Sequence, residues 1–213
     1  MKIRQTGLSV GMLPTGPQNC ITDVAGVMVG HVTLDYPLDG AGVDYACTGV
    51  TAILPHKGNV FKQKVTAASY VLNGFGKTTG LVQVNELGQL ESPIMLTNTF
   101  AVPAVTQGTV EYMLAENPEI GETTGTINIV VGECNDSYLN SIREFAVKPE
   151  HAIEAIRKAS GQQAEEGAVG AGKGMICFGY KGGIGSSSRM IGEYTIGCLV
   201  LANFGKKEEH QKF

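Results

Sequence analysis

The amino-acid sequence predicts a single mixed α/β domain spanning residues 1–213. Three observations carry this prediction: short β-branched apolar segments recur along the chain, two segments between them have helical spacing, and 43% of the 213 residues are hydrophobic. That proportion is enough to bury a sizeable core. The segments do not follow the regular alternation of strand and helix that a doubly wound sheet requires.

The first half of the chain contains three expected strands and one expected helix. Residues 27–34 are rich in β-branched side chains, and apolar and polar residues alternate over part of this segment. Residues 48–54 show the same pattern up to Pro55, and residues 93–97 carry a short apolar run. Apolar residues then recur at spacings of three to five and end before Asn117, which predicts a helix. Those residues are Val102, Val105, Val110, Met113 and Leu114.

The second half contains three further expected strands and a second helix. Residues 126–131 form a continuous apolar run, typical of a strand covered on both faces, and end in the polar sequence GECNDS. A helix is expected at residues 151–159, because Pro149 suits a first turn and basic residues lie near the C-terminal end. Residues 175–178 and 194–203 are expected as strands on either side of a tight glycine loop.

Charge and hydropathy exclude two classes of protein. The formal net charge is -4 and only 17% of residues are charged, so no basic surface is expected to bind nucleic acid. No stretch approaches the roughly 20 apolar residues that span a bilayer, and the N-terminus has no apolar run of a secretory signal. We therefore expect a cytoplasmic protein that binds neither nucleic acid nor membrane.

The sequence offers no motif for a metal or an organic cofactor, and we expect none. Its five cysteines contain no CxxC pair and are expected to be buried small apolar side chains, and HExxH is absent. The glycine-rich residues 167–174 resemble a phosphate-binding loop only in part, because Gly174 stands where that loop needs a hydroxyl. Residues 182–189 lack the necessary lysine.

A serine, histidine and aspartate triad is also not expected. No GxSxG motif occurs, and each of the four histidines, at positions 31, 56, 151 and 210, fits a structural or exposed role better than a catalytic one. Ser186 follows Gly185 and is interpreted as part of a glycine loop, while Thr195 lies inside an apolar strand. Neither is expected to be a nucleophile.

Polar side chains at strand ends are the remaining candidates for a site. They are Asn98, Thr99, Glu133, Asn135 and Asn203. Active sites of α/β proteins collect such groups at strand ends. Together these residues supply a carboxylate for an amine and amides for an oxyanion, which is half of an acyl-transfer site.

Five ordered blocks of sequence carry a family resemblance. They are ITDVAGVMVGHVTL, TGVTAILP, NGFGKTTGLVQVNELGQLESPIMLTNT, AVGAGKGMICFGYKGGIGSSSR and YTIGCLVLANFG. In this order they are similar to the DmpA family of L-aminopeptidase/D-esterases and β-aminopeptidases. The resemblance implies a four-layer αββα sandwich and a precursor that cuts itself into a larger and a smaller chain, without a cofactor.

The same resemblance assigns roles to three residues. Glu133 corresponds to the acidic residue that receives the free amino group of the substrate, and Asn203 to the amide of the oxyanion hole. Asn135 stands where family members carry an aromatic side chain near the substrate, so this contact departs from the family pattern. The nucleophile, an N-terminal serine with its own α-amine as base, belongs to the smaller chain, and we expect it beyond Phe213.

The resemblance therefore predicts an aminopeptidase that acts on short peptides, amides or esters, with the smaller chain of the same precursor as partner and a homo-oligomeric assembly. Two alternatives stay open. An enzyme similar to ornithine acetyltransferase would share the self-processing but pass the acyl group to an amine. A non-catalytic binding or scaffold protein would need no second chain.

Overall fold

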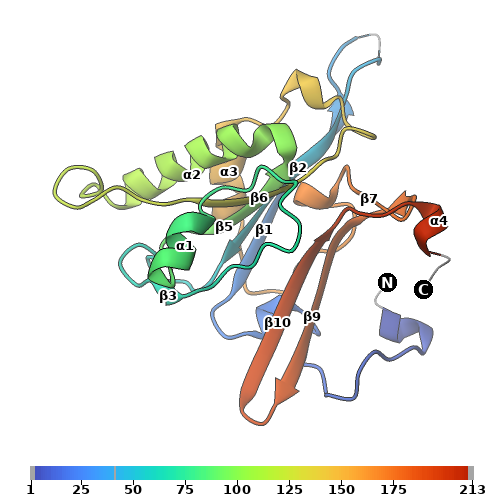
Figure 1. Ribbon diagram of the computed structural model, residues 1–213, viewed down its shortest axis with the longest axis horizontal. Coiled ribbons are helices and arrows are strands. Elements are labelled where there is room, and N and C mark those ends of the chain that lie inside the picture. The colour runs from blue at the N-terminus through green and yellow to red at the C-terminus, as the bar shows by residue number, and fades with distance from the viewer. Residues whose placement is uncertain (1–2, 41, 211–213) are drawn as a thin grey trace.

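The computed structural model describes residues 3–40 and 42–210, and its centre is a four-stranded sheet in the order β1-β2-β5-β6 (Figure 1). The strands are β1 (Met28–Pro37), β2 (Tyr45–Leu54), β5 (Ile94–Asn98) and β6 (Val130–Cys134). β1 pairs antiparallel with β2, and β2 antiparallel with β5, whereas β5 and β6 are parallel. β5 and β6, which are far apart in the sequence, therefore end at the same edge of the sheet.

Two helices, α2 (Val102–Glu116) and α3 (Pro149–Arg157), pack against each other and against this sheet (Figure 1). α3 contacts β1 and β2, and α2 contacts β5 and β6. The two helices can approach closely because residue 108 is a glycine. A Cβ atom there would lie 2.0 Å from the carbonyl oxygen of Pro149. The main apolar core lies between these helices and the sheet, and its fully buried side chains include Val50, Met95, Val105 and Val131.

A hairpin of β9 (Gly183–Ile191) and β10 (Tyr194–Ala202) forms a second β layer that projects away from α2 and α3 (Figure 1). The 3₁₀ turn η5 (Gly170–Gly172) contacts β1, β2 and β5 of the sheet as well as both strands of the hairpin. This chain therefore contributes one helical layer and two β layers to an α/β sandwich. The mixed α/β fold predicted from the sequence is confirmed.

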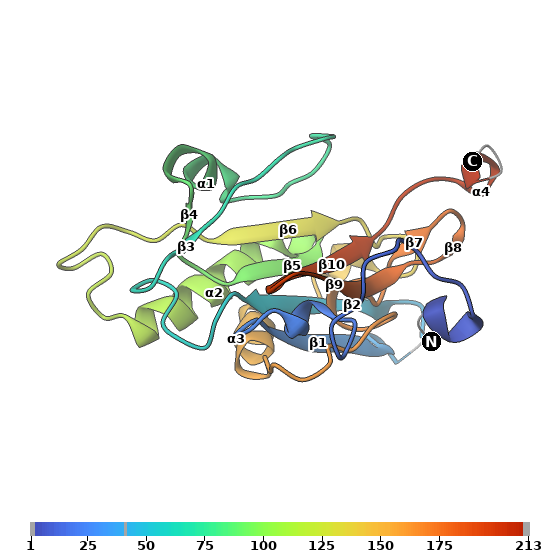
Figure 2. The ribbon, with the colours of Figure 1, turned by 90° about the horizontal axis from the view of Figure 1, so that it is seen from below.

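Shorter elements connect these layers, and Figure 2 shows α1 beyond the β6 edge of the central sheet and α3 toward its β1 edge. The shorter elements are η1 (Ile3–Thr6), η2 (Ile21–Asp23), β3 (Val65–Thr66), α1 (Leu81–Leu87), β4 (Gln89–Leu90), η3 (Thr99–Ala101), η4 (Ile142–Glu144), β7 (Ile176–Cys177), β8 (Tyr180–Lys181) and α4 (Lys207–His210). Within the described ranges, no helix is both long and apolar enough to cross a membrane.

Most of the expected elements are confirmed, and three details were wrong. Residues 126–129 are not a strand, and β6 begins at Val130 and continues through Glu133. Residues 183–191 form a strand where a glycine loop was expected, and β7 has only two residues.

The hairpin and the cysteines differ from expectation in their burial. Alternate residues of β10 are exposed, so this strand is covered on one face only in the described chain. All five cysteines are free thiols, as expected, but Cys198 is exposed and only Cys20 is fully buried.

Candidate active site

The parallel pair β5 and β6 brings the predicted strand-end residues together. Thr97 pairs with Glu133 and Asn98 with Cys134, so the segments that follow both strands start side by side. This position is the carboxyl edge of the parallel strands, where α/β proteins usually place a site. The sequence missed one point, because Glu133 lies within β6 and not after it.

Glu133 is held by two segments that are far apart in the sequence. Its Oε1 accepts a hydrogen bond of 2.8 Å from the main-chain N–H of Lys77, and its Oε2 accepts one from the hydroxyl of Thr99. The ammonium of Lys77 does not take part in this contact but lies 5.1 Å from the centre of the Phe75 ring. An ionised carboxylate has about four acceptor positions. These two contacts leave Glu133 able to accept N–H groups from a ligand ammonium.

The segment before α1 is itself fixed to β6. The N–H of Thr79 donates to the carbonyl of Val131 at 3.0 Å, and the reverse bond measures 3.3 Å. Gly76 leaves room for this carboxylate, since a Cβ atom there would lie 3.1 Å from Oε1 of Glu133, a tight contact. The glycines of NGFGKTTG were the sequence signal for this contact, which the sequence analysis did not interpret.

Asn203 follows β10 and is held by two main-chain groups. Its Oδ1 accepts a 3.0 Å hydrogen bond from the N–H of Ile176, and its Nδ2 donates to the carbonyl oxygen of Asn135 at 3.0 Å. An amide nitrogen carries two hydrogens. The second N–H of Asn203 is therefore available to a developing oxyanion, and the plane of the amide is already set.

Asn135 connects the two halves of the site through its main chain. It lies two residues after Glu133, which limits the distance between their Cα atoms to about 7 Å. Its side-chain oxygen accepts a hydrogen bond of 2.8 Å from the N–H of Ser137, which closes a local turn. Contact between the Asn135 side chain and substrate stays a prediction, whereas its carbonyl holds Asn203.

Asn98 is one of the strand-end amides that the sequence offered, and its contacts are those of a capping residue. Its Oδ1 accepts the N–H groups of Phe100 and Ala101, at 3.0 and 2.9 Å, and its Nδ2 donates to the hydroxyl of Thr48 at 2.8 Å. The side chain is 4% exposed. Asn98 caps the turn that leads into α2, so we do not assign it to the oxyanion hole.

A buried carboxyl group, Asp136, lies directly beyond Asn135. It is fully buried, and its Oδ1 accepts a 3.1 Å hydrogen bond from Nδ2 of Asn140. Burial raises the pKa of Asp136, and this effect is partly offset by the neighbouring polar groups of Thr48, Asn140 and Asn98. In the described part of the chain, its Oδ2 has no hydrogen-bond partner of normal geometry.

We expect Asp136→Asn to raise stability at neutral pH. Because the pKa of Asp136 is raised in the folded state, its contribution is most favourable below the unfolded value of about 4 and is lost as pH rises through the folded pKa. The amide keeps an acceptor for Asn140 and removes the charge, so the free energy of unfolding at pH 7 should increase by about 1–3 kcal/mol. Urea unfolding at pH 4 and pH 7 measures this difference.

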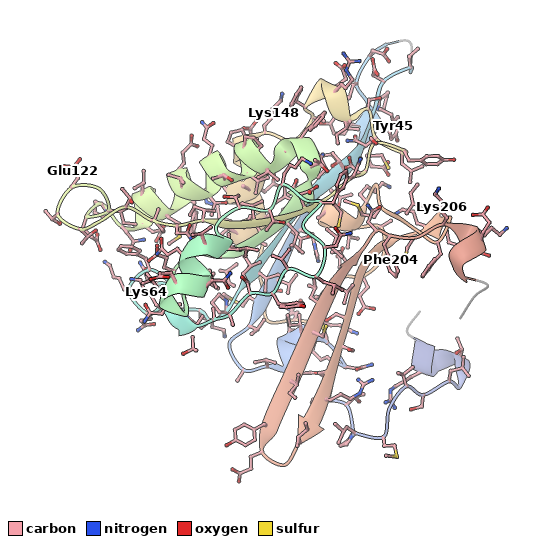
Figure 3. The ribbon with its side chains drawn as sticks, in the orientation of Figure 1. Tyr45, Lys64, Glu122, Lys148, Phe204 and Lys206 are labelled. Atoms are coloured by element: carbon pink, nitrogen blue, oxygen red, sulfur yellow. The ribbon has the colours of Figure 1, made fainter. Side chains whose placement is uncertain are left out.

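The matched control for that experiment is Glu122→Gln, since Glu122 is exposed at the far tip of the molecule (Figure 3). Its substitution should change stability little at either pH. A variant with asparagine at position 136 that is less stable than the wild type at pH 7 contradicts the interpretation.

Among the described residues, the hydroxyl groups that lie beside a base include three serine or threonine side chains, although the sequence suggested none. Thr51 contacts Nδ1 of His31 at 2.9 Å, and Ser188 donates to Asp23 at 2.6 Å. Thr51 and Ser188 are only 0% and 1% exposed, so neither can reach a substrate. The third pair is Thr99 with Glu133, and both oxygens of this carboxylate already accept a hydrogen bond, one from the hydroxyl of Thr99 and one from the N–H of Lys77.

The other motifs have structural partners. Oγ of Ser186 accepts the N–H of Ile21 at 2.7 Å and donates to the carbonyl of Cys198 at 2.9 Å, so it ties η2 to the hairpin. The ammonium of Lys173 contacts Asp35 at 2.5 Å and is not directed to a phosphate site. Among the residues that the structure describes, no three His, Cys, Asp or Glu side chains gather as a metal site does.

Comparison with known proteins agrees with this arrangement at the level of fold and of sequence. One similar structure is that of L-aminopeptidase D-Ala-esterase/amidase from Ochrobactrum anthropi, described as a prototype for the serine aminopeptidases and a variant of the Ntn hydrolase fold. It superposes with a TM-score of 0.86 at 35% identity, over 96% of this chain and 58% of its own. The PH0078 protein from Pyrococcus horikoshii OT3 superposes with a TM-score of 0.92 at 52% identity, over 98% of this chain and 60% of its own. The chain thus has the fold of the N-terminal-nucleophile hydrolases.

The family follows from the sequence match. Residues 19–212 match the model of peptidase family S58, and the chain belongs to that family. The β-peptidyl aminopeptidase BapA of Sphingosinicella microcystinivorans is 40% identical over 201 residues, which cover 90% of this chain and 49% of the relative. The chain spans about half the length of the curated relatives it matches.

Proposed function

We propose that this chain forms the amine-binding and oxyanion-binding part of a serine-type aminopeptidase that releases N-terminal residues from short peptides, amides or esters. One observation carries the proposal: Glu133, with acceptor positions open to a ligand, lies two residues from the carbonyl that orients Asn203. The two groups can therefore hold the ammonium and the carbonyl oxygen of one small substrate. Membership of family S58 and the aminopeptidase relatives support hydrolysis over acyl transfer to an amine.

In this mechanism the substrate ammonium binds Glu133 and the scissile carbonyl oxygen points at Nδ2 of Asn203. The nucleophile is an N-terminal serine of a smaller chain cut from the same precursor, with its own α-amine as base. Attack by the serine oxygen forms a tetrahedral oxyanion that the Asn203 amide stabilises. The leaving amine takes the proton, and water then hydrolyses the acyl-enzyme and regenerates the serine.

The hairpin β9–β10 supports a second chain at this site. On one face of β10 the side chains of Tyr194, Ile196 and Val200 are 79%, 56% and 49% exposed. In the described chain β10 pairs with β9 alone, so its other edge is unpaired. An apolar face beside an open edge is suited to a further strand. The homo-oligomeric assembly and the cytoplasmic location stay predictions.

Expression of the complete protein tests the proposal. We expect a precursor that separates into two chains, the smaller beginning with serine or threonine, and turnover of free-amine p-nitroanilides but poor turnover of their N-acetylated forms. Intact mass, N-terminal sequencing and the assay measure these outcomes. Residues 1–213 alone should show no peptidase activity, and a monodisperse, active preparation of this fragment contradicts the assignment of the nucleophile.

A further inference from the structure

An apolar groove lies beside Glu133, on the side of α2. It is lined by Lys77, Thr99, Phe100, Val102, Pro103 and Phe145. Its cavity volume is about 410 Å³. This lies within the range of roughly 300–1,000 Å³ for small-molecule sites.

The groove and the carboxylate share two residues. Lys77 and Thr99 line the groove and are also the two residues that hydrogen-bond Glu133. When the ammonium of a ligand binds Glu133, the ligand atoms next to the ammonium can therefore reach the groove. The carboxylate of Glu133 and the apolar lining of the groove together fit an amine that carries an apolar substituent.

Two aromatic rings form the wall of the groove. Phe100 and Phe145 stack with their centroids 5.9 Å apart and their planes 16° from parallel. They are 47% and 56% exposed, so burial in the core does not account for either ring. Exposed aromatic surface of this kind commonly marks a binding site.

Phe145 also has an unfavourable backbone. Its φ and ψ are both 48°, in the left-handed region that disfavours residues with a side chain. Such outliers persist where the surrounding structure requires them and gather at ligand sites. A glycine would suit this backbone better, so the phenyl ring at this position points to a role in the groove.

We propose that this groove binds the side chain of the substrate's N-terminal residue, and that it favours aromatic and branched apolar groups. The substrate ammonium lies on Glu133 and its side chain packs against Phe100 and Phe145. This inference rests on the proposed aminopeptidase function and adds the class of residue that is released.

The test is Phe145→Gly in the complete, processed protein. Substrates are the p-nitroanilides of glycine, leucine and phenylalanine, and the measured quantity is kcat/KM for phenylalanine divided by that for glycine. We expect this ratio to fall about tenfold or more, because the contact with the ring is lost. The melting temperature should stay equal or rise, since glycine suits the left-handed backbone.

Tyr36→Ala is the matched control. Tyr36 lies on β1, outside the groove, and is 43% exposed, close to the 47% of Phe100. The substitution should leave the ratio unchanged. If Phe145→Gly lowers both values of kcat/KM by the same factor, the groove does not select the side chain. A change of oligomeric mass in this variant, with an unchanged ratio, would assign the rings to a subunit interface and overturn the proposal.

Binding without turnover separates this inference from the proposed function. Calorimetry with benzylamine and methylamine uses the same ammonium with and without an aromatic group. We expect the wild type to bind benzylamine at least tenfold more tightly, and Phe145→Gly to lose this preference. Equal binding of both amines by the wild type rejects the groove even if the enzyme is active, whereas the expected preference in an inactive protein supports the groove and rejects only the reaction.

Discussion

Replacing Asn203 with alanine in the complete, processed protein is expected to lower kcat by about 10²- to 10³-fold. Nδ2 of Asn203 is held in place by the carbonyl of Asn135 and has one N–H left for the oxyanion. Loss of one such donor elsewhere has an effect of this size. Initial-rate assays with a free-amine p-nitroanilide measure it, and self-cleavage is expected to slow as well if the same donor acts in that step.

Two further variants make the test specific. Asn203→Asp keeps an acceptor for Ile176 but directs negative charge at the carbonyl of Asn135, so it should be as impaired as the alanine variant. Asn85→Ala is the control, because Asn85 is an exposed residue of α1. A loss of less than fivefold for Asn203→Ala rejects the oxyanion assignment.

Glu133→Gln is expected to lower kcat/KM for free-amine substrates by about 10- to 100-fold. Hydrogen bonds to charged groups contribute about 1.5–3 kcal/mol, and glutamine removes the charge that pairs with the ammonium. The amide oxygen can still accept the N–H of Lys77, and the hydroxyl of Thr99 can turn to accept from the amide. The site should therefore keep its shape, so the decrease in kcat/KM measures the contribution of the charge on Glu133.

N-acetylated substrates provide the comparison. They should be poor for the wild type and should change little in Glu133→Gln, because they carry no ammonium. Glu86→Gln serves as the control on the exposed surface of α1. Equal turnover of acetylated and free-amine substrates by the wild type removes the role assigned to Glu133.

The strands with β-branched apolar residues could be predicted because their pattern is local. β9 could not, because its sequence GIGSSSRMI has weak strand preference, and pairing with β10 along its whole length makes it a strand. The glycine at 183 also has a long-range cause, since a Cβ atom there would lie 2.1 Å from the carbonyl oxygen of Gly167.

The late start of β6 has a similar explanation. Residues 126–129 have a strand-like sequence, but the N–H of Asn128 donates to Oε1 of Glu91 and its Nδ2 donates to the carbonyl of Gly80. Side-chain contacts from distant segments replace the ladder at this point. No pattern within residues 126–131 shows them.

The site was predictable in its residue types and only partly in its roles. A carboxylate and amides at strand ends indicated an acyl-transfer site, and Glu133 and Asn203 stay the assigned pair. Asn98 has the same residue type as Asn203, and only its buried contacts show that it caps a turn. The contributions of Lys77 and Phe145 depend on tertiary contacts of loops, which spacing does not reveal.

The contact between Asn203 and position 135 does not depend on the side chain at position 135. Since the carbonyl, and not the side chain, of Asn135 holds the amide, every residue type provides the same acceptor. A substitution at this position is therefore expected to alter the predicted contact with substrate without removing the acceptor that orients Asn203. The departure from an aromatic residue here leaves the hydrogen bond to Asn203 in place.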